Sequence, residues 1–418
     1  MKLELRVERL TKSGDGVAPH NGRSVFIAGA LPGEKVLAEV REDGKALRGE
    51  LDAVLEQSAE RRAPVCALAS TCGGCDWMHL HDTAQLREKQ EVVVSALDQL
   101  GCVARDAYEL LPAIPSDAST GSRRRAVLHP VNGALGFNTR KSHERVAVSH
   151  CPALTDPLAD LPGKLGTALG AAVLKELDEV RLLEAEGRVA VSFHFKGNLK
   201  PRYREVAELL RREGLVDGVV LHPAEGKGGF ITVGHFALEE DGVLLRPDGF
   251  AQANAPVNRR LVAQAVELLD VDASHRVLEL YSGNGNFTFR LAAHAREIVA
   301  VESFPLSVSL AQQAALKRGV KNVRFVQGDS EKIAKGFVNE RERFDRLLVD
   351  PPRAGAPGVG AWASGTLASR VVYVACDPTS LARDAKDLNA HGFKPLALQV
   401  VDLFPQPHHV EAVMAFAR

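Results

Sequence analysis

The chain has 418 residues, of which 45% are hydrophobic and 25% charged, and its formal net charge is -1 at pH 7. The length predicts two or three domains, and the composition is that of a globular protein. Because basic and acidic side chains balance, the chain as a whole is not a polycation, and any contact with nucleic acid has to come from local patches.

The first ten residues alternate charged and apolar side chains, and no run of 18 apolar residues occurs anywhere. We therefore expect neither a secretion signal nor a membrane span. The expected location is the cytoplasm, where thiols stay reduced, so the six cysteines need an explanation other than disulfides. We expect a monomer.

Residues 1–58 are predicted to form a small β-barrel. Strand-like runs at 3–7, 24–27 and 35–40 are separated by glycine and proline turns, as in all-β modules. A barrel of this size commonly binds oligonucleotides, which makes RNA binding the expected role and a purely structural cap the alternative.

Residues 59–245 are expected to form a central domain of mixed strands and helices, with strands at 189–195 and 218–222. A helix is predicted over about 83–100, and this helix can pack on the catalytic domain. Its predicted buried face has residues three or four apart along the chain, namely Leu86, Gln90, Val93, Leu97 and Leu100.

Four cysteines of the central domain form a candidate metal site: Cys66, Cys72 and Cys75 lie close together, and Cys151 follows much later. Four thiolates suit either tetrahedral zinc or an iron–sulfur cluster. A zinc ribbon would usually have two C-x2-C pairs, whereas only one occurs here. The spacing therefore favours a [4Fe–4S] cluster, with a structural or RNA-facing role.

A basic run between residues 121 and 145 begins with Arg123, Arg124 and Arg125 and contains one acidic residue. Such a local excess of positive charge in a neutral protein suits a phosphate backbone. The run is therefore predicted to contact RNA, although a solvated charged face is the simpler alternative.

Residues 246–418 alternate strands and helices regularly, which predicts a parallel, Rossmann-like α/β sheet. The strand at 276–281 leads into a glycine turn, Ser282–Gly285, and the next two strands end at Glu302 and Asp329. The turn lacks the third glycine that a pyrophosphate site needs. Adenosine bound through acids and backbone, without phosphate, indicates S-adenosylmethionine.

Two further strands end abruptly at a polar residue followed by proline. One is followed by Asp350-Pro-Pro-Arg353 and the other by Cys376-Asp377-Pro378. Because the carboxyl ends of such strands form the ligand crevice, an acid, an arginine and a thiol are expected to meet there. That combination predicts covalent chemistry on a polar, planar substrate.

These motifs together resemble the RNA uracil-5-methyltransferase family, in particular its TRAM-containing iron–sulfur branch that acts on 23S rRNA. The resemblance spans nearly the whole chain, from the barrel and the cysteines to the segment 404–411, Phe-Pro-Gln-Pro-His-His-Val-Glu. It implies a TRAM barrel at 1–58, a cluster-bearing domain at 59–245 and a class I methyltransferase domain at 246–418. The implied reaction is methylation of carbon 5 of a uridine in RNA.

The resemblance also implies roles for individual residues. Cys376 would be the nucleophile that adds to carbon 6 of uracil, and Glu411 the base that removes the proton from carbon 5. From their position alone, and not from the resemblance, Asp350 and Arg353 are expected to hold the uracil edge or stabilise developing charge. The four cysteines would hold the [4Fe–4S] cluster. The implied S-adenosylmethionine site consists of Gln252, Tyr281, Asn286, Glu302, Asp329 and Asp350.

The chain departs from the family pattern at Asp377, where the family has asparagine, and at Ser122, where it has an aromatic residue. A carboxylate beside the thiol is expected to raise the thiol's pKa and oppose its activation. The alternatives are a tRNA uracil-5-methyltransferase, a cytosine-5 enzyme, and a non-catalytic RNA-binding factor of ribosome assembly.

Overall fold

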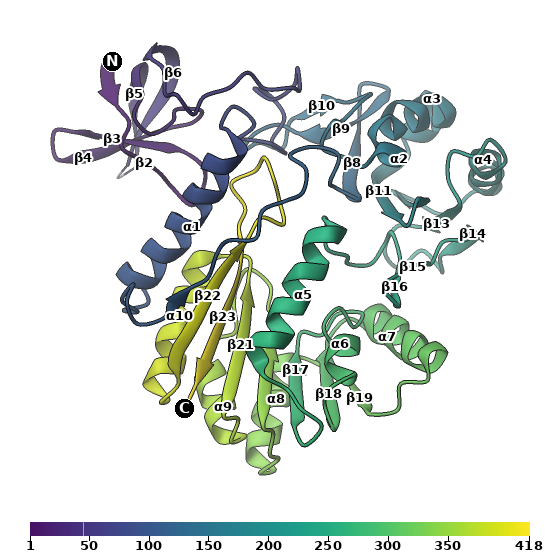
Figure 1. Cartoon of the computed structure of the whole chain (residues 1–418). Coiled ribbons are helices and arrows are strands. Elements are labelled where there is room, and N and C mark those ends of the chain that lie inside the picture. The colour runs from purple at the N-terminus through teal and green to yellow at the C-terminus, as the bar shows by residue number, and fades with distance from the viewer. Residues whose placement is uncertain (45) are drawn as a thin grey trace.

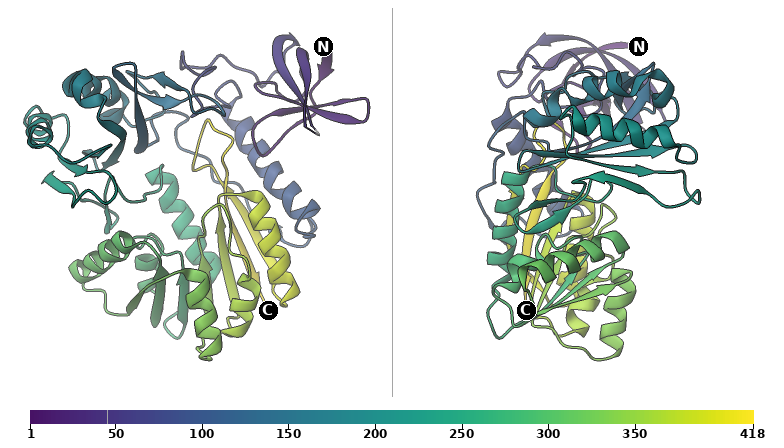
Figure 2. Two further views of the ribbon diagram at one scale, coloured as in Figure 1. Left: turned by 180° about the vertical axis from the view of Figure 1, so that it is seen from behind. Right: turned by 90° about the vertical axis from the view of Figure 1, so that its right-hand side faces the viewer.

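The computed structural model describes residues 1–44 and 46–418, and it has three parts. Figure 1 shows the N-terminal barrel and the central domain at one end of the molecule and the C-terminal α/β domain at the other, an arrangement that the turned views of Figure 2 repeat. Among the described helices, none combines the length and apolar character that crossing a membrane requires.

The N-terminal barrel is one sheet with the strand order β1-β5-β6-β4-β3-β2. β1 and β2 lie at the two edges of this sheet but are separated by only Val7 and Glu8, so the sheet curls into a closed barrel. The Glu8 N–H, for example, donates to Val17 O at 2.8 Å. The strands are β1 Lys2–Arg6, β2 Arg9–Leu10, β3 Gly16–His20, β4 Arg23–Ile27, β5 Lys35–Asp43 and β6 Ala46–Glu56.

The central domain is a seven-stranded sheet, ordered β10-β9-β8-β11-β12-β13-β14, with a separate hairpin of β15 and β16. Apolar side chains of α3 and α4 pack on one face of the sheet. The elements are β8 Arg125–Val131, β9 Ala134–Asn138, β10 Arg145–Ala147, α2 Asp156–Ala159, α3 Leu161–Leu174, β11 Leu177–Ala185, β12 Arg188–Phe195, α4 Pro201–Arg212, β13 Gly218–His222, β14 Ile231–Gly234, β15 Leu238–Glu240 and β16 Val243–Leu245.

The α/β domain is an eight-stranded sheet, ordered β19-β18-β17-β20-β21-β23-β22-β7, in which β23 runs antiparallel to both neighbours. Helices cover both faces, so apolar clusters lie on each side. The elements are α5 Ala255–Leu269, β17 Arg276–Leu280, α6 Thr288–Ala292, β18 Glu297–Glu302, α7 Pro305–Arg318, β19 Val323–Gln327, α8 Ser330–Asn339, β20 Arg346–Val349, α9 Val359–Gly365, β21 Arg370–Ala375, α10 Pro378–Ala390, β22 Lys394–Val401 and β23 Glu411–Ala417.

Two elements from before residue 111 join this C-terminal domain: α1 (Asp82–Gln99) and the short strand β7 (Glu109–Leu110), which pairs with β22. α1 agrees with the predicted helix, and Val93 and Leu97 are buried in the core of the α/β domain. The buried face differs from the predicted one, because Gln85 and Lys89 are buried while Leu100 is 53% exposed. Polar partners on the loop between β22 and β23 accommodate the two buried side chains.

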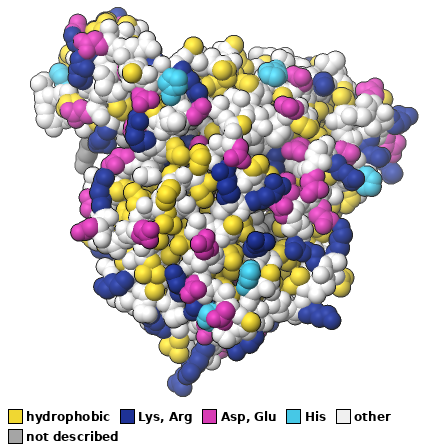
Figure 3. All heavy atoms as spheres, viewed as in Figure 1, with side chains coloured by type: hydrophobic (Ala, Val, Ile, Leu, Met, Phe, Trp, Pro, Cys, Tyr) yellow, Lys and Arg dark blue, Asp and Glu magenta, His cyan; other side chains and the backbone are white. Residues whose placement is uncertain are grey.

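Figure 3 shows basic and acidic side chains mixed over one face of the molecule, as the near-neutral charge predicts.

Candidate active site

Five polar side chains predicted from strand ends gather at one edge of the α/β sheet. Strands β17 to β21 pair in parallel, so their carboxyl ends meet at the same edge. Tyr281, Asp350 and Cys376 directly follow β17, β20 and β21. Glu302 ends β18, and Asp329 lies two residues after β19.

Cys376 and Glu411 occupy facing positions across two antiparallel strands. β21 and β23 pair in register up to Ala375 opposite Ala412, so the next residue on each strand brings Cys376 opposite Glu411. Directly opposed residues in an antiparallel pair direct their side chains to the same face, with Cβ atoms about 4.5–5.5 Å apart. Glu411 is 3% exposed. The sheet thus places a buried carboxyl beside the thiol.

The thiol and the two nearest acids hold their protons tightly in the substrate-free protein. The pKa of Cys376 is raised from 9.0 to about 12, first by burial and then by the charges of Glu411 and Asp350, while Arg353 lowers it. Burial raises the pKa of Asp350, and burial together with Asp350 raises that of Glu411. Two acids in one dry site cannot both ionise easily. The site therefore favours a neutral thiol until substrate binds.

Asp377 caps a helix and is not a main cause of the raised pKa of the Cys376 thiol. Its carboxylate caps α10, accepting the N–H groups of Thr379 and Ser380 at 2.9 Å each, and lies 3.4 Å from Lys12 Nζ of the barrel. A carboxylate at a helix N-terminus is stabilised by the helix dipole. The expectation that Asp377 is the acid opposing the thiol's ionisation is wrong, because burial, Glu411 and Asp350 are the leading causes.

The glycine turn after β17 is bonded to the acid that ends β18. Glu302 accepts the Gly283 N–H at 2.9 Å through Oε2 and the Phe304 N–H at 2.7 Å through Oε1. Asp329 caps α8 by accepting the Lys332 N–H at 2.9 Å. Since a carboxylate has about four lone-pair sites, each acid keeps acceptors for a ligand hydroxyl.

Gln252 and Asn286 do not come from strand ends. Both line a cavity of about 400 Å³ between the central domain and α5. The side chains of Asn286 and Asn258 pair reciprocally, at 2.8 and 3.1 Å. The structure therefore brings four of the six predicted cofactor residues together at the sheet edge and places these two on the neighbouring cavity.

Glu279 is a buried acid that the sequence interpretation did not single out. It lies inside β17 and is 0% exposed, and the polar group next to its carboxyl is Thr288. Burial raises its pKa to about 8. The signal was an acid within an otherwise apolar strand, Arg276–Leu280, directly before the glycine turn. A buried acid without a charged partner at such a place is suited to meet a cationic ligand group.

A second buried group anchors the loop that follows Arg353. Asp384 accepts the Tyr373 hydroxyl at 2.6 Å and the Ala356 N–H at 2.7 Å, and Arg383 donates to it at 2.7 Å. Arg383 also donates to Ala354 O at 2.8 Å. These contacts fix the backbone between β20 and α9 and so hold Arg353 near the thiol.

The four predicted cluster cysteines line one small cavity with apolar walls that include Leu68, Met78, Phe137 and Val148. Burial, first of all, raises the pKa of Cys72, Cys75 (to about 11) and Cys151. In the described part of the chain, no three His, Cys, Asp or Glu side chains are grouped to hold a metal ion. The structure brings the thiols together without forming a site for a single ion.

The predicted arginines have different environments. Arg123 and Arg125 line a cavity of about 460 Å³ with Lys141 and His129, next to the cysteine loop. Arg353 is exposed and lies 3.3 Å from the His409 ring. Arg124 is 3% exposed, pairs with Glu240 and donates to Gln252 O at 2.7 Å. The expectation that Arg124 contacts RNA is therefore wrong: its charge is used inside the protein.

The fold and site together define the class. The strand order, with β23 antiparallel, the glycine turn after β17 and the acids at successive strand ends are those of a class I S-adenosylmethionine-dependent methyltransferase. A family model described as tRNA (Uracil-5-)-methyltransferase matches residues 244–418, and a TRAM domain model matches residues 2–51.

Curated relatives match the whole chain. The 23S rRNA (uracil(1939)-C(5))-methyltransferase RlmD of Aeromonas hydrophila is 34% identical over 429 residues, which cover 100% of this chain and 96% of that protein. That of Shewanella woodyi is 35% identical over 433 residues, covering 99% and 96%. The chain therefore belongs to the RNA uracil-C5-methyltransferase family, which confirms the resemblance seen in the sequence.

One solved structure matches the complete fold. Pyrococcus abyssi tRNA (uracil-54, C5)-methyltransferase in complex with S-adenosyl-L-homocysteine superimposes with a TM-score of 0.77 at 23% identity, covering 99% of both chains. This match shows that the two chains share one overall fold along their whole length.

Proposed function

We propose that this protein methylates carbon 5 of a uridine in 23S rRNA, with S-adenosylmethionine as the methyl donor. The observation that carries the proposal is the pairing of Cys376 with Glu411 across β21 and β23, beside the acidic edge of a methyltransferase sheet. A thiol with a carboxyl on the same face is the pair that conjugate addition and subsequent proton removal require.

As substrate binds, the Cys376 thiol and the Glu411 carboxyl release their protons to solvent. The Cys376 thiolate sulfur then forms a bond to carbon 6 of the uracil, and the electron pair of the 5,6 double bond moves to carbon 5 and makes it nucleophilic. S-Adenosylmethionine, when bound, would supply the methyl group that carbon 5 takes up, with its sulfur keeping the electron pair of the broken bond as a neutral thioether. The Glu411 carboxylate then removes the proton on carbon 5, and the carbon–sulfur bond breaks to restore the double bond and the thiolate. Exposed Arg353 lies where it can stabilise the charge that develops on the uracil oxygen.

The strand-end acids fit an adenosyl donor. Glu302 and Asp329 would hold the hydroxyl and amine groups, and Tyr281 would pack against the adenine. The buried Glu279 would face the donor's cationic part through the glycine turn. Gln252 and Asn286 would approach from the neighbouring cavity, and Asp350 would stand between donor and thiol. Binding of the donor, measured by calorimetry, should weaken on Glu302→Gln.

The large-subunit RNA is favoured because curated relatives named as 23S rRNA methyltransferases match at 34% and 35% identity over the full length. tRNA is the second candidate, because the solved structure with the same fold is that of a tRNA (uracil-54, C5)-methyltransferase, at 23% identity. The central cavity lined by Arg123 and Arg125 would hold phosphates of either RNA.

The four cysteines fit a [4Fe–4S] cluster better than zinc. A zinc ribbon would usually offer two C-x2-C pairs, whereas only Cys72 and Cys75 have that spacing here. A four-iron cluster is larger and takes thiolates from separate loops around an apolar cavity, which is how these four lie. Its role would be structural, tying Cys75 to Cys151. Iron and sulfide analysis of protein purified without air should find about four of each, and Cys75→Ala should lose them.

The test is methyl transfer to unmodified 23S rRNA and to tRNA, followed by nucleoside mass spectrometry. We expect 5-methyluridine in the 23S rRNA alone, no product from Cys376→Ala, and full activity in the matched variant Cys102→Ala, whose thiol is exposed. Glu411→Gln should accumulate the protein–RNA adduct. If the product appears in tRNA alone, the substrate is tRNA and not 23S rRNA. If intact protein forms no product on either RNA, the non-catalytic assembly factor is favoured. Cytoplasmic location and a monomeric state stay predictions.

A further inference from the structure

We infer that the barrel loop Thr11–Asp15 is a positioning element of the active site, which holds the loop of the nucleophile through Lys12 and the loop of the base through Gly14. The inference rests on the proposed function, since it takes Cys376 as nucleophile and Glu411 as base. It gives the N-terminal barrel a role in the chemical steps in addition to RNA binding.

Lys12 reaches the start of α10, directly after the thiol. Its Nζ donates to Thr379 Oγ1 at 2.6 Å and lies 3.4 Å from Asp377 Oδ2. Asp377 neighbours Cys376 in the chain and caps α10 with its other oxygen. The Asp377 carboxylate offers Lys12 a charged partner. The barrel is thereby bonded to the segment that sets the position of the thiol.

Gly14 lies against the segment that leads to the base. Its φ is +83°, and a Cβ there would be 2.8 Å from Asp76 Oδ2, 3.0 Å from Trp77 Nε1 and 3.1 Å from His408 Cβ. Trp77 Nε1–H donates to Gly14 O at 3.1 Å. Asp76 in turn accepts the His408 N–H at 3.0 Å and lies 2.5 Å from His408 Nδ1. Only glycine allows this close approach.

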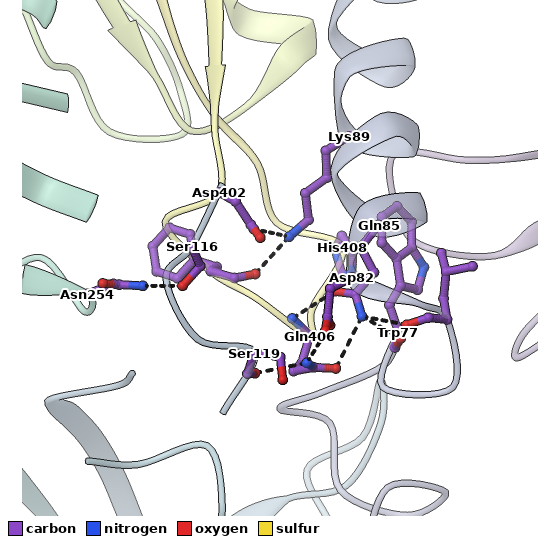
Figure 4. A network of polar contacts seen from close by, with 12 residues as sticks. Trp77, Asp82, Gln85, Lys89, Ser116, Ser119, Asn254, Asp402, Gln406 and His408 are labelled. Atoms are coloured by element: carbon purple, nitrogen blue, oxygen red, sulfur yellow. Dashed lines mark hydrogen bonds and ion pairs between the residues drawn. The ribbon is translucent and has the colours of Figure 1, made fainter. Parts of the chain in front are cut away.

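The segment between β22 and β23 depends on such contacts, because it leaves the sheet before Glu411 begins β23. Figure 1 shows it reaching from the sheet toward the other two domains, and Figure 4 shows its partners. Gln406, at a φ of 84°, donates its N–H to Gln85 Oε1 at 2.9 Å and accepts the Trp77 N–H at 2.7 Å. A strained, buried residue of this kind persists only where its surroundings fix it.

The two contacts should affect different steps. Lys12→Met loosens the nucleophile's loop. RNA containing 5-fluorouridine traps the covalent adduct, because the fluorine on carbon 5 cannot be removed as a proton is. The rate of this trapping should therefore fall at saturating RNA. Because the ion pair is partly exposed, the expected loss is about three- to fivefold. Lys12→Arg should keep the rate, and the loss should be smaller in an Asp377→Asn background, since the two residues act on each other.

Gly14→Ala pushes on Asp76 and His408 and so displaces the base. Turnover on ordinary uridine RNA should fall by about 10- to 100-fold, with the protein–RNA adduct accumulating, while trapping on 5-fluorouridine RNA stays near the wild-type rate. Gly22→Ala is the matched control: Gly22 belongs to the same barrel, has a φ of +73°, and has nothing within 4 Å of an added Cβ. It should keep both rates.

The inference is overturned if Lys12→Met and Gly14→Ala weaken RNA binding but leave both rates unchanged at saturating RNA, because the loop would then be an RNA contact alone. It is also overturned if Gly22→Ala loses turnover as Gly14→Ala does, because that loss would report only on barrel folding. Failure of the proposed function would be distinct: the wild-type protein itself would then form neither adduct nor product.

Discussion

The thiol of Cys376 should react slowly with iodoacetamide in the substrate-free protein, although it is the proposed nucleophile. Its pKa is raised from 9.0 to about 12. At pH 8 about one in ten ordinary thiols is ionised, against about one in ten thousand at the raised pKa. A thiolate of higher pKa is intrinsically more nucleophilic, which recovers roughly 15- to 30-fold. The net expectation is alkylation about 30- to 60-fold slower than that of an ordinary thiol.

The assay follows peptide alkylation by mass spectrometry, with exposed Cys102 of the same chain as internal reference. The logarithm of the Cys376 rate should rise with pH, with a slope near one, from pH 7 to 10, because the thiol's pKa lies above that range. A Cys376 rate equal to that of Cys102, or a plateau below pH 9, would refute this electrostatic account and mean that the thiol is activated before RNA arrives.

Two further predictions concern buried charges. Burial raises the pKa of Glu279 from 4.5 to about 8. The protonated carboxyl therefore contributes its full stability below pH 4.5, and this contribution is lost as pH rises through about 8. Relative to Glu279→Gln, the free energy of unfolding of the wild type should therefore fall by about 1 kcal/mol per pH unit between pH 5 and 8, as measured by urea titration. The same pH dependence in both proteins would contradict this prediction. Arg125→Ala should reduce the slope of the logarithm of the RNA-binding constant against the logarithm of salt concentration by about one. Arg124→Ala should leave that slope unchanged. It should instead lower the free energy of unfolding by about 3 kcal/mol, because Glu240 loses its buried partner.

Strand ends are the most predictable part of this molecule. Each predicted strand of the α/β domain is an apolar run that stops at a polar residue, and parallel pairing forces those stops to one edge. The amino-acid sequence alone therefore suffices to place Tyr281, Glu302, Asp350 and Cys376 together. Glu411 followed from the family resemblance, and the antiparallel register of β23 supplies the physical reason for its position opposite the thiol.

The misplaced residues share a cause. Arg124 belongs to a basic run and Asp377 neighbours a thiol, but each finds a partner far away in the sequence. Arg124 pairs with Glu240, 116 positions later, and Asp377 meets Lys12, 365 positions earlier. Whether a charge serves a ligand or the fold depends on such partners, and a local pattern does not contain them.

The segment between β22 and β23, residues 402–410, leads to the proposed base Glu411 and is called the base segment here. Contacts from all three domains hold it and so determine the position of the Glu411 side chain. Lys89 offers a test of that dependence. Lys89 Nζ on α1 lies 2.7 Å from Asp402 Oδ1 and donates to Phe404 O at 2.8 Å, with the side chain buried (Figure 4). Removing one partner of a buried ion pair leaves an uncompensated charge, so Lys89→Met should lower the free energy of unfolding by about 3–5 kcal/mol.

The matched control is Arg87→Met on the same helix, whose side chain is 58% exposed and whose loss should change stability by at most about 0.5 kcal/mol. Adding Asp402→Leu to Lys89→Met should recover most of the stability, because no buried charge then lacks a partner. Turnover should stay low in that double variant, because stability returns while the contact with Phe404 O, which holds the segment before Glu411, does not. If Lys89→Met costs no more than Arg87→Met, the base segment is held by its backbone alone, and the domains around it do not determine its position.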